Sequence, residues 1–171
     1  RVIKDEAEVA LIRKAIKVQE AALKAVLPTI KPGQTELQIA ARLEMEMKTR
    51  GSSEPGFQTI VATGANGSLP HYRPHDKKLT KNTSVLIDWG AVVDGYHGDM
   101  TRVVTLGKWP RKIEEIFKVV LEAQESAAAA LAPGKSSREV DAVARKIIEK
   151  AGFGDYFGHG LGHGIGLNGH E

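Results

Sequence analysis

Two aspartates lie on opposite arms of a predicted β-hairpin. Apolar, β-branched residues surround Asp94-Gly95 within residues 85–106, and this dipeptide favours a two-residue type I′ turn. The turn sets Asp88 opposite Thr101. Side chains on one face repeat every two residues, so Asp99 shares the face of Thr101 and therefore of Asp88. We expect the two carboxylates to be diagonal neighbours, with backbones about 7–8 Å apart.

This carboxylate pair needs a positive partner, because two charges aimed at one point from a strand are costly to hold unpaired. Arg102 is close in sequence, but the alternation directs it to the opposite face. A divalent cation, or two cations about 3.5–4 Å apart, would resolve the conflict. The hairpin alone leaves a second interpretation open, in which one aspartate is solvated and the other belongs to a turn.

A second chemically active stretch, residues 157–171, is rich in glycine and holds three of the six histidines, His159, His163 and His170. Each glycine weakens a helix or strand by about 0.5–1 kcal/mol. Such a run is typical of backbone that approaches a ligand closely. We expect strand and loop here. On a strand, His159 and His163 share a face, whereas His170 needs a bend to join them. Imidazole is the commonest metal ligand among side chains.

Paired helices are predicted to position these residues. Apolar spacing, caps and Pro-Gly breaks predict helices over residues 4–27, from the N-cap Thr35 to Gly51, from Pro110 to about Leu131, and from Ser136 or Ser137 to Gly152. A short strand is predicted over residues 57–62. The polar stretch 63–81, which contains His71, is predicted to be a long loop of the kind that often carries function.

The two helix pairs repeat each other. Their Pro-Gly breaks, at Pro32-Gly33 and Pro133-Gly134, lie 101 residues apart, and so do Gly51 and Gly152. Two α-α-β units in one domain predict pseudo-two-fold symmetry with a site where the halves meet. The alternative is that any two helix pairs joined by Pro-Gly look alike.

Composition narrows the classes of function. The chain has 171 residues, 42% hydrophobic and 26% charged, as in an ordinary globular domain. The lack of cysteine excludes a zinc–thiolate site, a cysteine nucleophile and a disulfide framework, and favours a cytoplasmic location. Apolar runs fall short of the ~20 residues of a membrane span. The net charge of +3 comes from scattered lysines and arginines, so we expect no nucleic-acid partner.

Three motifs follow one another along the chain: Ser68-Leu-Pro-His71-Tyr, then Asp88-Trp-Gly with Asp99-Met-Thr-Arg102, and finally His159-Gly-Leu-Gly-His163-Gly-Ile-Gly-Leu with His170-Glu171. With them, the chain resembles the catalytic domain of the pita-bread metallopeptidases, which include aminopeptidase P, prolidase and methionine aminopeptidase. The resemblance runs from about Lys4 to the end. It implies an α/β (α+β) fold with two pseudo-symmetric α-α-β halves around a central antiparallel sheet.

The resemblance also implies a dinuclear metal site. By position, Asp88 matches the bidentate ligand of one metal, Asp99 the carboxylate that bridges both metals, and His163 the imidazole ligand of the second. Two divalent ions are expected, with manganese first and cobalt or zinc as alternatives. A metal-bridging hydroxide would be the nucleophile.

His71, His159 and His170 match the histidines that contact the scissile carbonyl and the leaving side of the substrate. The implied enzyme is a metalloaminopeptidase or Xaa-Pro dipeptidase, and its partner is a peptide with proline at the second position. A homodimer is compatible with the family.

Features around these motifs favour the Xaa-Pro branch, namely the loop 68–71 and the lead-in Glu54-Pro-Gly-Phe57. Tyr96-His-Gly-Asp99 keeps a methionine aminopeptidase-like enzyme as an alternative. A non-catalytic pita-bread binding module and a creatinase-like, metal-independent amidinohydrolase are further alternatives. Creatinase lacks the metal carboxylates, so Asp88 and Asp99 argue against it.

The chain departs from the family pattern at its ends. The family's two further glutamate ligands lie downstream of the segment matched by His170-Glu171, and the sequence ends there. It begins with Arg rather than Met, and nothing matches the N-terminal domain of aminopeptidase P. We therefore expect residues 1–171 to be an incomplete metallopeptidase catalytic domain, with its N-terminal domain and C-terminal portion absent and without turnover as it stands.

Overall fold

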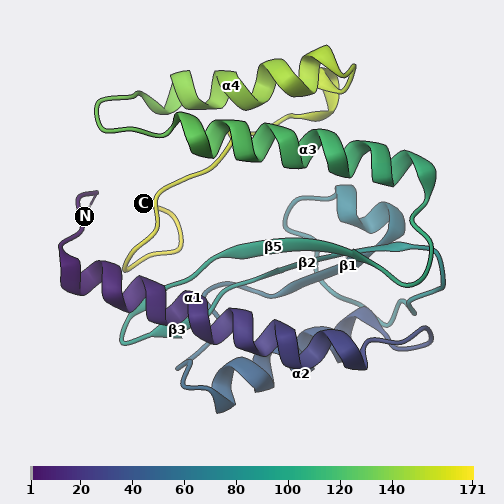
Figure 1. Cartoon of the computed structure of the whole chain (residues 1–171). Coiled ribbons are helices and arrows are strands. Elements are labelled where there is room, and N and C mark those ends of the chain that lie inside the picture. Colours follow the sequence, from purple (N-terminus) through teal and green to yellow (C-terminus); the bar gives the residue numbers. More distant parts are fainter. Residues whose placement is uncertain (1) are drawn as a thin grey trace. The chain divides into compact units, whose positions relative to one another are not determined.

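The computed structural model describes residues 2–171, which form two compact units (Figure 1). The first unit comprises residues 2–109 together with Gly164–Glu171, and the second comprises Pro110–His163. The elements of the first unit are α1 (Glu6–Val26), α2 (Glu36–Thr49), β1 (Ile60–Thr63), β2 (Ser84–Trp89), β3 (Val92–Val93), β4 (Tyr96–His97) and β5 (Met100–Thr105), with 3-10 turns at Leu27–Thr29 and Gly64–Ser68.

Both helices of the first unit begin at capping boxes. Asp5 and Glu8 form the box of α1, and Thr35 and Gln38 form that of α2, as the sequence predicts for Thr35. Gly51 follows α2 with a φ of 102°, which confirms its role as the glycine that ends the helix. The capping box of Thr35 and Gln38 fixes the start of α2, and thereby the position of Glu36, its first residue.

The sheet is antiparallel in the order β1-β2-β5, and β3 pairs with β4. Asp88 lies opposite Thr101, and Val93 lies opposite Tyr96, as the predicted hairpin register requires. The turn at Asp94 and Gly95 has φ values of 50° and 84°, so both residues are left-handed as a type I′ turn needs.

The hairpin narrows between its two paired sections. Gly98 N donates to Ala91 O at 2.8 Å, so the register continues across this gap. A Cβ added to Gly90 would lie 2.1 Å from Gly98 O, which means that only glycine fits at this approach of the two arms. Asp99 directly follows this narrow point and precedes β5.

The predicted strand 57–62 is shorter and later than expected, since β1 runs from Ile60 to Thr63. Pro55 makes only an isolated bridge to Ala91, and Gly56 N donates to Gly90 O at 2.9 Å. The lead-in therefore pairs with the narrow part of the hairpin before the chain enters the sheet.

One face of the sheet packs on α1 and α2 (Figure 1). Val85, Ile87 and Trp89 are buried on that face, whereas Leu86 and Asp88 alternate onto the other face and are only half-buried. Trp89 Nε1 donates to the backbone oxygen of Gln19 at 3.1 Å, and Gln19 Oε1 accepts from Ala91 N at 3.1 Å. These two bonds tie α1 to the hairpin that carries Asp88.

The second unit consists of α3 (Arg111–Ala130), α4 (Ser137–Lys150) and a 3-10 turn at Gly154–Tyr156. Its core contains small and branched residues from both helices, Ala123, Ala127, Val140, Ala144 and Ile148. Ser136 caps α4 in a capping box with Glu139, so of the two predicted N-caps the first is used.

The predicted repeat is present in the helices. Ser137 and Lys150, which bound α4, each lie 101 residues after Glu36 and Thr49, which bound α2. The buried residues of α4, Val140, Ala144 and Ile148, are likewise displaced by 101 from Ile39, Leu43 and Met47 of α2. Repeated burial at matched positions is stronger support for the internal repeat than the shared Pro-Gly breaks.

The strand predicted within residues 157–171 is wrong, because the structure forms only loop and bends there. Glycine occupies every second position from 158 to 166, so the segment has few side chains to pack and a large entropy to lose on ordering. Its end closes on itself instead, where Gly164 and Glu171 exchange two backbone hydrogen bonds of 3.1 and 3.0 Å.

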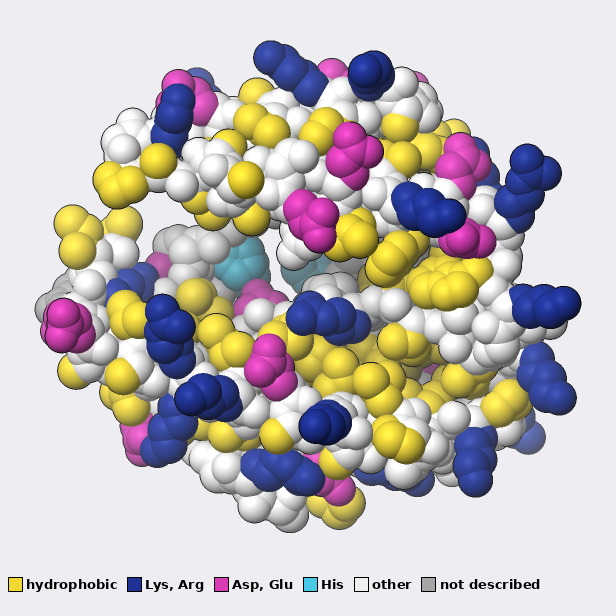
Figure 2. Space-filling view, viewed as in Figure 1, with side chains coloured by type: hydrophobic (Ala, Val, Ile, Leu, Met, Phe, Trp, Pro, Cys, Tyr) yellow, Lys and Arg dark blue, Asp and Glu magenta, His cyan; other side chains and the backbone are white. Residues whose placement is uncertain are grey.

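The surface adds two observations. On the face drawn in Figure 2, Lys and Arg side chains are interspersed with acidic and apolar ones. Across residues 2–171, no helix is both long and apolar enough to span a lipid bilayer.

Candidate functional site

Asp88 is held from across the sheet. Thr101 lies opposite it on β5, and the Thr101 Oγ1 hydroxyl donates to Asp88 Oδ1 at 2.9 Å. The carboxylate is half-buried on the sheet face that α1 and α2 do not cover. Hydrogen bonds of this kind are typical of carboxylates that ligate metals, because they fix the orientation of the ligand. Asp88 is therefore chemically suited to a divalent cation.

Asp99 is the second predicted carboxylate and is half-buried one residue before β5. The strand alternation, continued back from Thr101, assigns it to the face of Asp88. The proximity of the two carboxylates stays a prediction. Carboxylate oxygens and an imidazole are donors that suit hard divalent metals, so the types of the predicted ligands fit such a cation.

The predicted site residues divide between the two units. Asp88, Asp99, His71 and His170 belong to the first unit, and His159 and His163 belong to the second. Within the described chain, no three His, Asp or Glu side chains are grouped so that they could hold a metal ion.

His71 lies in the loop between β1 and β2, exposed, with a φ of 58°. A left-handed conformation costs a residue with a side chain about 1–2 kcal/mol. Such a conformation persists only where its surroundings hold it. The next residue, Tyr72, supplies one hold, because its hydroxyl donates to Glu36 Oε2 at 2.7 Å.

Glu36 is the centre of a buried network around this loop. Its side chain is fully buried at the first position of α2, where the helix N-terminus favours a negative charge. Four donors reach its two oxygens: Thr63 N at 2.8 Å, Asn66 Nδ2 at 3.1 Å, Tyr72 OH at 2.7 Å and His75 N at 3.4 Å. The network joins α2, the end of β1 and the loop that carries His71.

Tyr72, the phenol partner of Glu36, is held in its protonated form. Burial, followed by the hydrogen bond to Glu36 and the charge of Glu36, raises the pKa of Tyr72 to about 12. Tyr72 therefore remains a hydrogen-bond donor throughout the physiological pH range. Glu36 is absent from the predicted site residues because an acidic residue in the first turn of a helix is common. No pattern in the sequence distinguishes this one as buried.

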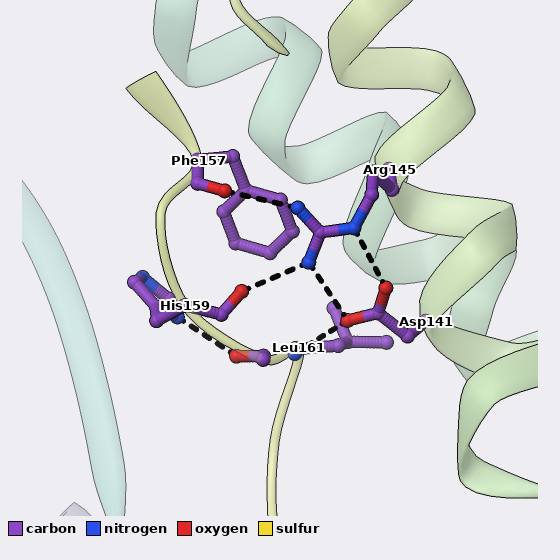
Figure 3. Close-up of polar contacts among 6 residues, drawn as sticks. Asp141, Arg145, Phe157, His159 and Leu161 are labelled. Atoms are coloured by element: carbon purple, nitrogen blue, oxygen red, sulfur yellow. Dashed lines mark hydrogen bonds and ion pairs between the residues drawn. The ribbon is translucent and has the colours of Figure 1, made fainter. Parts of the chain in front are cut away.

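The loop that carries His159 is held in a comparable way within the second unit (Figure 3). Arg145 on α4 donates from Nε to Asp141 Oδ2 at 2.8 Å and from Nη2 to Asp141 Oδ1 at 3.1 Å. Its remaining contacts reach the loop: Nη1 donates to Phe157 O at 2.9 Å, and Nη2 donates to His159 O at 2.9 Å. Asp141 Oδ1 also accepts from Leu161 N at 2.9 Å.

The ion pair is electrostatically strengthened on both sides. The hydrogen bond from Arg145 is the main cause that lowers the pKa of Asp141, with a further contribution from Leu161 N. The hydrogen bond to Asp141 in turn raises the pKa of Arg145. In the sequence this pair reads as an ordinary i,i+4 ion pair on a helix surface, so its contacts with a distant loop could not be predicted.

The segment that carries His170 is anchored in the first unit beside the start of α1 (Figure 1). Lys4 Nζ lies 2.7 Å from Glu171 Oε2, and both side chains are nearly buried. His97 N donates to Gly166 O at 2.8 Å, which ties the segment to β4. The hydrogen bond from Lys4 is the main cause that lowers the pKa of Glu171 to about 2. His170 itself is exposed.

Comparisons with known proteins show the family to which the chain belongs. The model of metallopeptidase family M24 matches residues 10–171. The chain is 42% identical over 171 residues to the Xaa-Pro dipeptidase of Pyrococcus furiosus, covering all of this chain and 49% of that protein. The crystal structure of the X-Pro aminopeptidase from Thermotoga maritima superposes with a TM-score of 0.97 at 42% identity, covering all of this chain and 49% of the other.

A prolidase structure from Pyrococcus furiosus superposes equally well, with a TM-score of 0.97 at 42% identity and coverage of 100% of this chain and 51% of the other. The chain thus spans about half the length of the relatives it matches. The antiparallel sheet with its paired helices is the corresponding part of the pita-bread fold. The chain belongs to metallopeptidase family M24.

Proposed function

We propose that the chain is the metal-binding part of an exopeptidase catalytic domain that hydrolyses Xaa-Pro peptide bonds. The observation that carries the proposal is the hairpin, where Asp88, oriented by Thr101, shares two antiparallel arms with Asp99. Relatives named Xaa-Pro dipeptidase and prolidase support the choice of substrate. The substrate is a peptide with proline at the second position.

Asp88, Asp99 and His163 would hold the metal, as two divalent ions with manganese first and cobalt or zinc as alternatives. Bound divalent ions would supply a hydroxide nucleophile at neutral pH, because they would lower the pKa of water towards about 7, and they would polarise the scissile carbonyl. Thr101 keeps the Asp88 carboxylate in one orientation while substrate binds.

Three histidines complete the proposal. His71, His159 and His170 contact the substrate, where they stabilise negative charge on the scissile carbonyl oxygen and deliver a proton to the leaving nitrogen. The buried Glu36 network fixes the loop of His71, and the Lys4–Glu171 ion pair anchors the segment of His170. We propose a cytoplasmic location, because the sequence has no cysteine with which to form a disulfide. A homodimer is compatible with this proposal.

Metal binding is the first test. Isothermal titration with Mn²⁺ of the natural protein that carries this sequence is compared with Asp88→Asn, Asp99→Asn and a control, Asp94→Asn, whose carboxylate lies at the exposed turn and pairs with Lys14. The expected result is binding that the two site variants lose and the control keeps. Binding that all four proteins share would contradict the assignment of Asp88 and Asp99.

Activity is the second test, made on the natural protein that carries this sequence. Xaa-Pro dipeptides, Xaa-Ala dipeptides and Met-Gly peptides are assayed with Mn²⁺. Selective cleavage of the Xaa-Pro substrates, abolished by Asp99→Asn, is the expected result. Preference for Met-Gly would point to a methionine aminopeptidase-like enzyme, and absence of any turnover by the metal-loaded protein would overturn the peptidase proposal.

A further inference from the structure

We infer that Asp141 and Arg145 are positioning residues that set the backbone of residues 157–161 and thereby the ring of His159. This inference deepens the proposed function, because it rests on the role proposed there for His159. It concerns one unit of the structure only, and all of its contacts lie between α4 and the loop that follows it (Figure 3).

The side chains of Phe157 and Leu161 pack against the core of the second unit, but the glycines of the loop have no such packing. Gly158, Gly160 and Gly162 alternate with its larger residues, and in the described structure a Cβ added to any of the three would meet no atom within 4 Å. Glycine backbone in open space loses much conformational entropy on ordering. The backbone between Phe157 and Leu161 therefore needs polar contacts beyond this packing if His159 is to keep one position.

Arg145 and Asp141 provide that restraint at three points. The guanidinium donates to Phe157 O and His159 O, which lie on either side of Gly158, and Asp141 Oδ1 accepts from Leu161 N. The fork geometry of a guanidinium allows Arg145 to reach two carbonyls while both of its remaining bonds go to one carboxylate. A lysine ammonium at this position could not span the same set of acceptors.

The restraint extends to the imidazole through ring contacts. The Arg145 guanidinium lies 4.5 Å from the centroid of the Phe157 ring, and the Phe157 and His159 rings meet edge to face with centroids 4.9 Å apart. These contacts are of the kind that favour one ring orientation over others. The position of His159 thus follows from that of Phe157, which Arg145 holds by both its backbone and its ring.

The same geometry selects one tautomer. His159 Nδ1 lies 2.8 Å from Gly160 O, and a carbonyl oxygen can only accept. Nδ1 therefore carries the proton in the neutral ring, and Nε2 is the nitrogen that acts as acceptor, or as donor once the ring is protonated. By holding the backbone of residues 157–161, the Asp141–Arg145 pair thereby decides which ring nitrogen of His159 bonds Gly160 O and which is left for a substrate group.

A second ion pair in the chain shows what a purely local pair looks like. Arg50 and Glu46 have the same i,i+4 spacing at the end of α2, but the hydrogen bonds of the Arg50 side chain go to Glu46 and Thr49, which belong to that helix. Arg145 differs because two of its four hydrogen bonds leave the helix for the loop. Arg50→Lys is therefore a matched control for Arg145→Lys.

Hydrogen–deuterium exchange tests the restraint on the natural protein that carries this sequence. Arg145→Lys and Asp141→Asn are expected to speed exchange of the amides of residues 157–161 by about tenfold, while the amides of α4 keep their protection. Arg50→Lys should leave both regions unchanged. Exchange in 157–161 that stays at the wild-type rate in both Arg145→Lys and Asp141→Asn would overturn the inference.

The tautomer gives an independent readout. A long-range ¹H–¹⁵N spectrum of the histidine rings should show His159 as the Nδ1–H form in the wild type and in Arg50→Lys, and as a mixture in Arg145→Lys. A His159 ring that is Nε2–H in the wild type, or unaltered in Arg145→Lys, would contradict the inference. Neither measurement depends on metal or on turnover.

Kinetics then separate the inference from the proposed function. If His159 acts on substrate, Arg145→Lys should lower kcat for an Xaa-Pro dipeptide by roughly 10–100-fold with a small change in KM. Full activity in His159→Ala would refute the proposed role of His159 and leave the exchange result standing. Full activity in Arg145→Lys beside an inactive His159→Ala would refute the positioning role alone.

Discussion

Thr101 and Asp88 face each other across β2 and β5, and the Thr101 hydroxyl donates to Asp88 Oδ1 at 2.9 Å. The register that pairs them follows from a turn six residues beyond Asp88, where Asp94 and Gly95 both adopt positive φ. A threonine at this position combines a β-branched side chain, which suits a strand, with a hydroxyl that fixes the carboxylate.

Removal of the Thr101 hydroxyl should weaken metal binding without unfolding the sheet. Thr101→Val keeps the branched shape but leaves Asp88 without this donor, and loss of such a bond typically costs about 10–100-fold in metal affinity. Thr101→Ser retains the hydroxyl and should bind nearly as well as the wild type. Mn²⁺ titration calorimetry measures both, and equal affinity of Thr101→Val and the wild type would contradict the role given to the hydroxyl.

Glu36 should be important for stability because its carboxylate is buried and accepts four hydrogen bonds. Glu36→Gln turns one acceptor oxygen into a donor that faces other donors, so the free energy of unfolding should fall by about 1–3 kcal/mol. Urea denaturation followed by circular dichroism measures the change. Glu46→Gln, at a partly exposed position at the end of the same helix, is the control and should alter stability little.

The same substitution should also loosen the loop of His71. Proteolysis of the folded protein should cut Glu36→Gln faster within residues 64–75 than it cuts the wild type. Asn66 and Tyr72 donate to different oxygens of Glu36, so one of them loses its acceptor when one oxygen becomes an amide nitrogen. Cleavage there at equal rates in both proteins would show that other contacts hold the loop.

The Lys4–Glu171 pair should make stability depend on acidic pH. The pKa of Glu171 falls from 4.5 to about 2 in the folded chain, so the native state keeps the carboxylate charged where the unfolded state takes up a proton. This contribution is fully present above about pH 4.5 and is lost as the pH falls towards about 2. In Lys4→Met, urea midpoints recorded between pH 6 and pH 2 should fall less steeply than in the wild type, and parallel curves would contradict the assignment.

Gly90 should tolerate no side chain. A Cβ at this position would lie 2.1 Å from Gly98 O, so Gly90→Ala must push apart the two arms of the hairpin between Asp88 and Asp99. We expect a loss of about 1–3 kcal/mol in the free energy of unfolding, together with weaker Mn²⁺ binding. Gly158→Ala, at a glycine with open space around it, is the control for thermal denaturation. Similar melting temperatures for both variants would refute the steric argument.

Features that depend on neighbours in sequence were predictable. The type I′ turn at Asp94-Gly95 and the capping residues Thr35 and Ser136 act within a few residues of themselves, so the register of Asp88 with Thr101 and the start of each capped helix follow from local chemistry. The 101-residue repeat is likewise visible in the spacing of Pro-Gly breaks, and the family follows from the order of its motifs.

Only the tertiary structure decided which ordinary charged residues hold the histidine loops. Glu36 and Arg145 look like common helix residues in the sequence. Their partners are far along the chain, and His75, which bonds Glu36, lies 39 residues after it. Burial and long-range hydrogen bonds arise from the packing of segments that the local pattern does not relate. The strand predicted within residues 157–171 is missing for a related reason. A strand needs a second strand beside it, and a segment with glycine at every second position has few side chains with which to hold one.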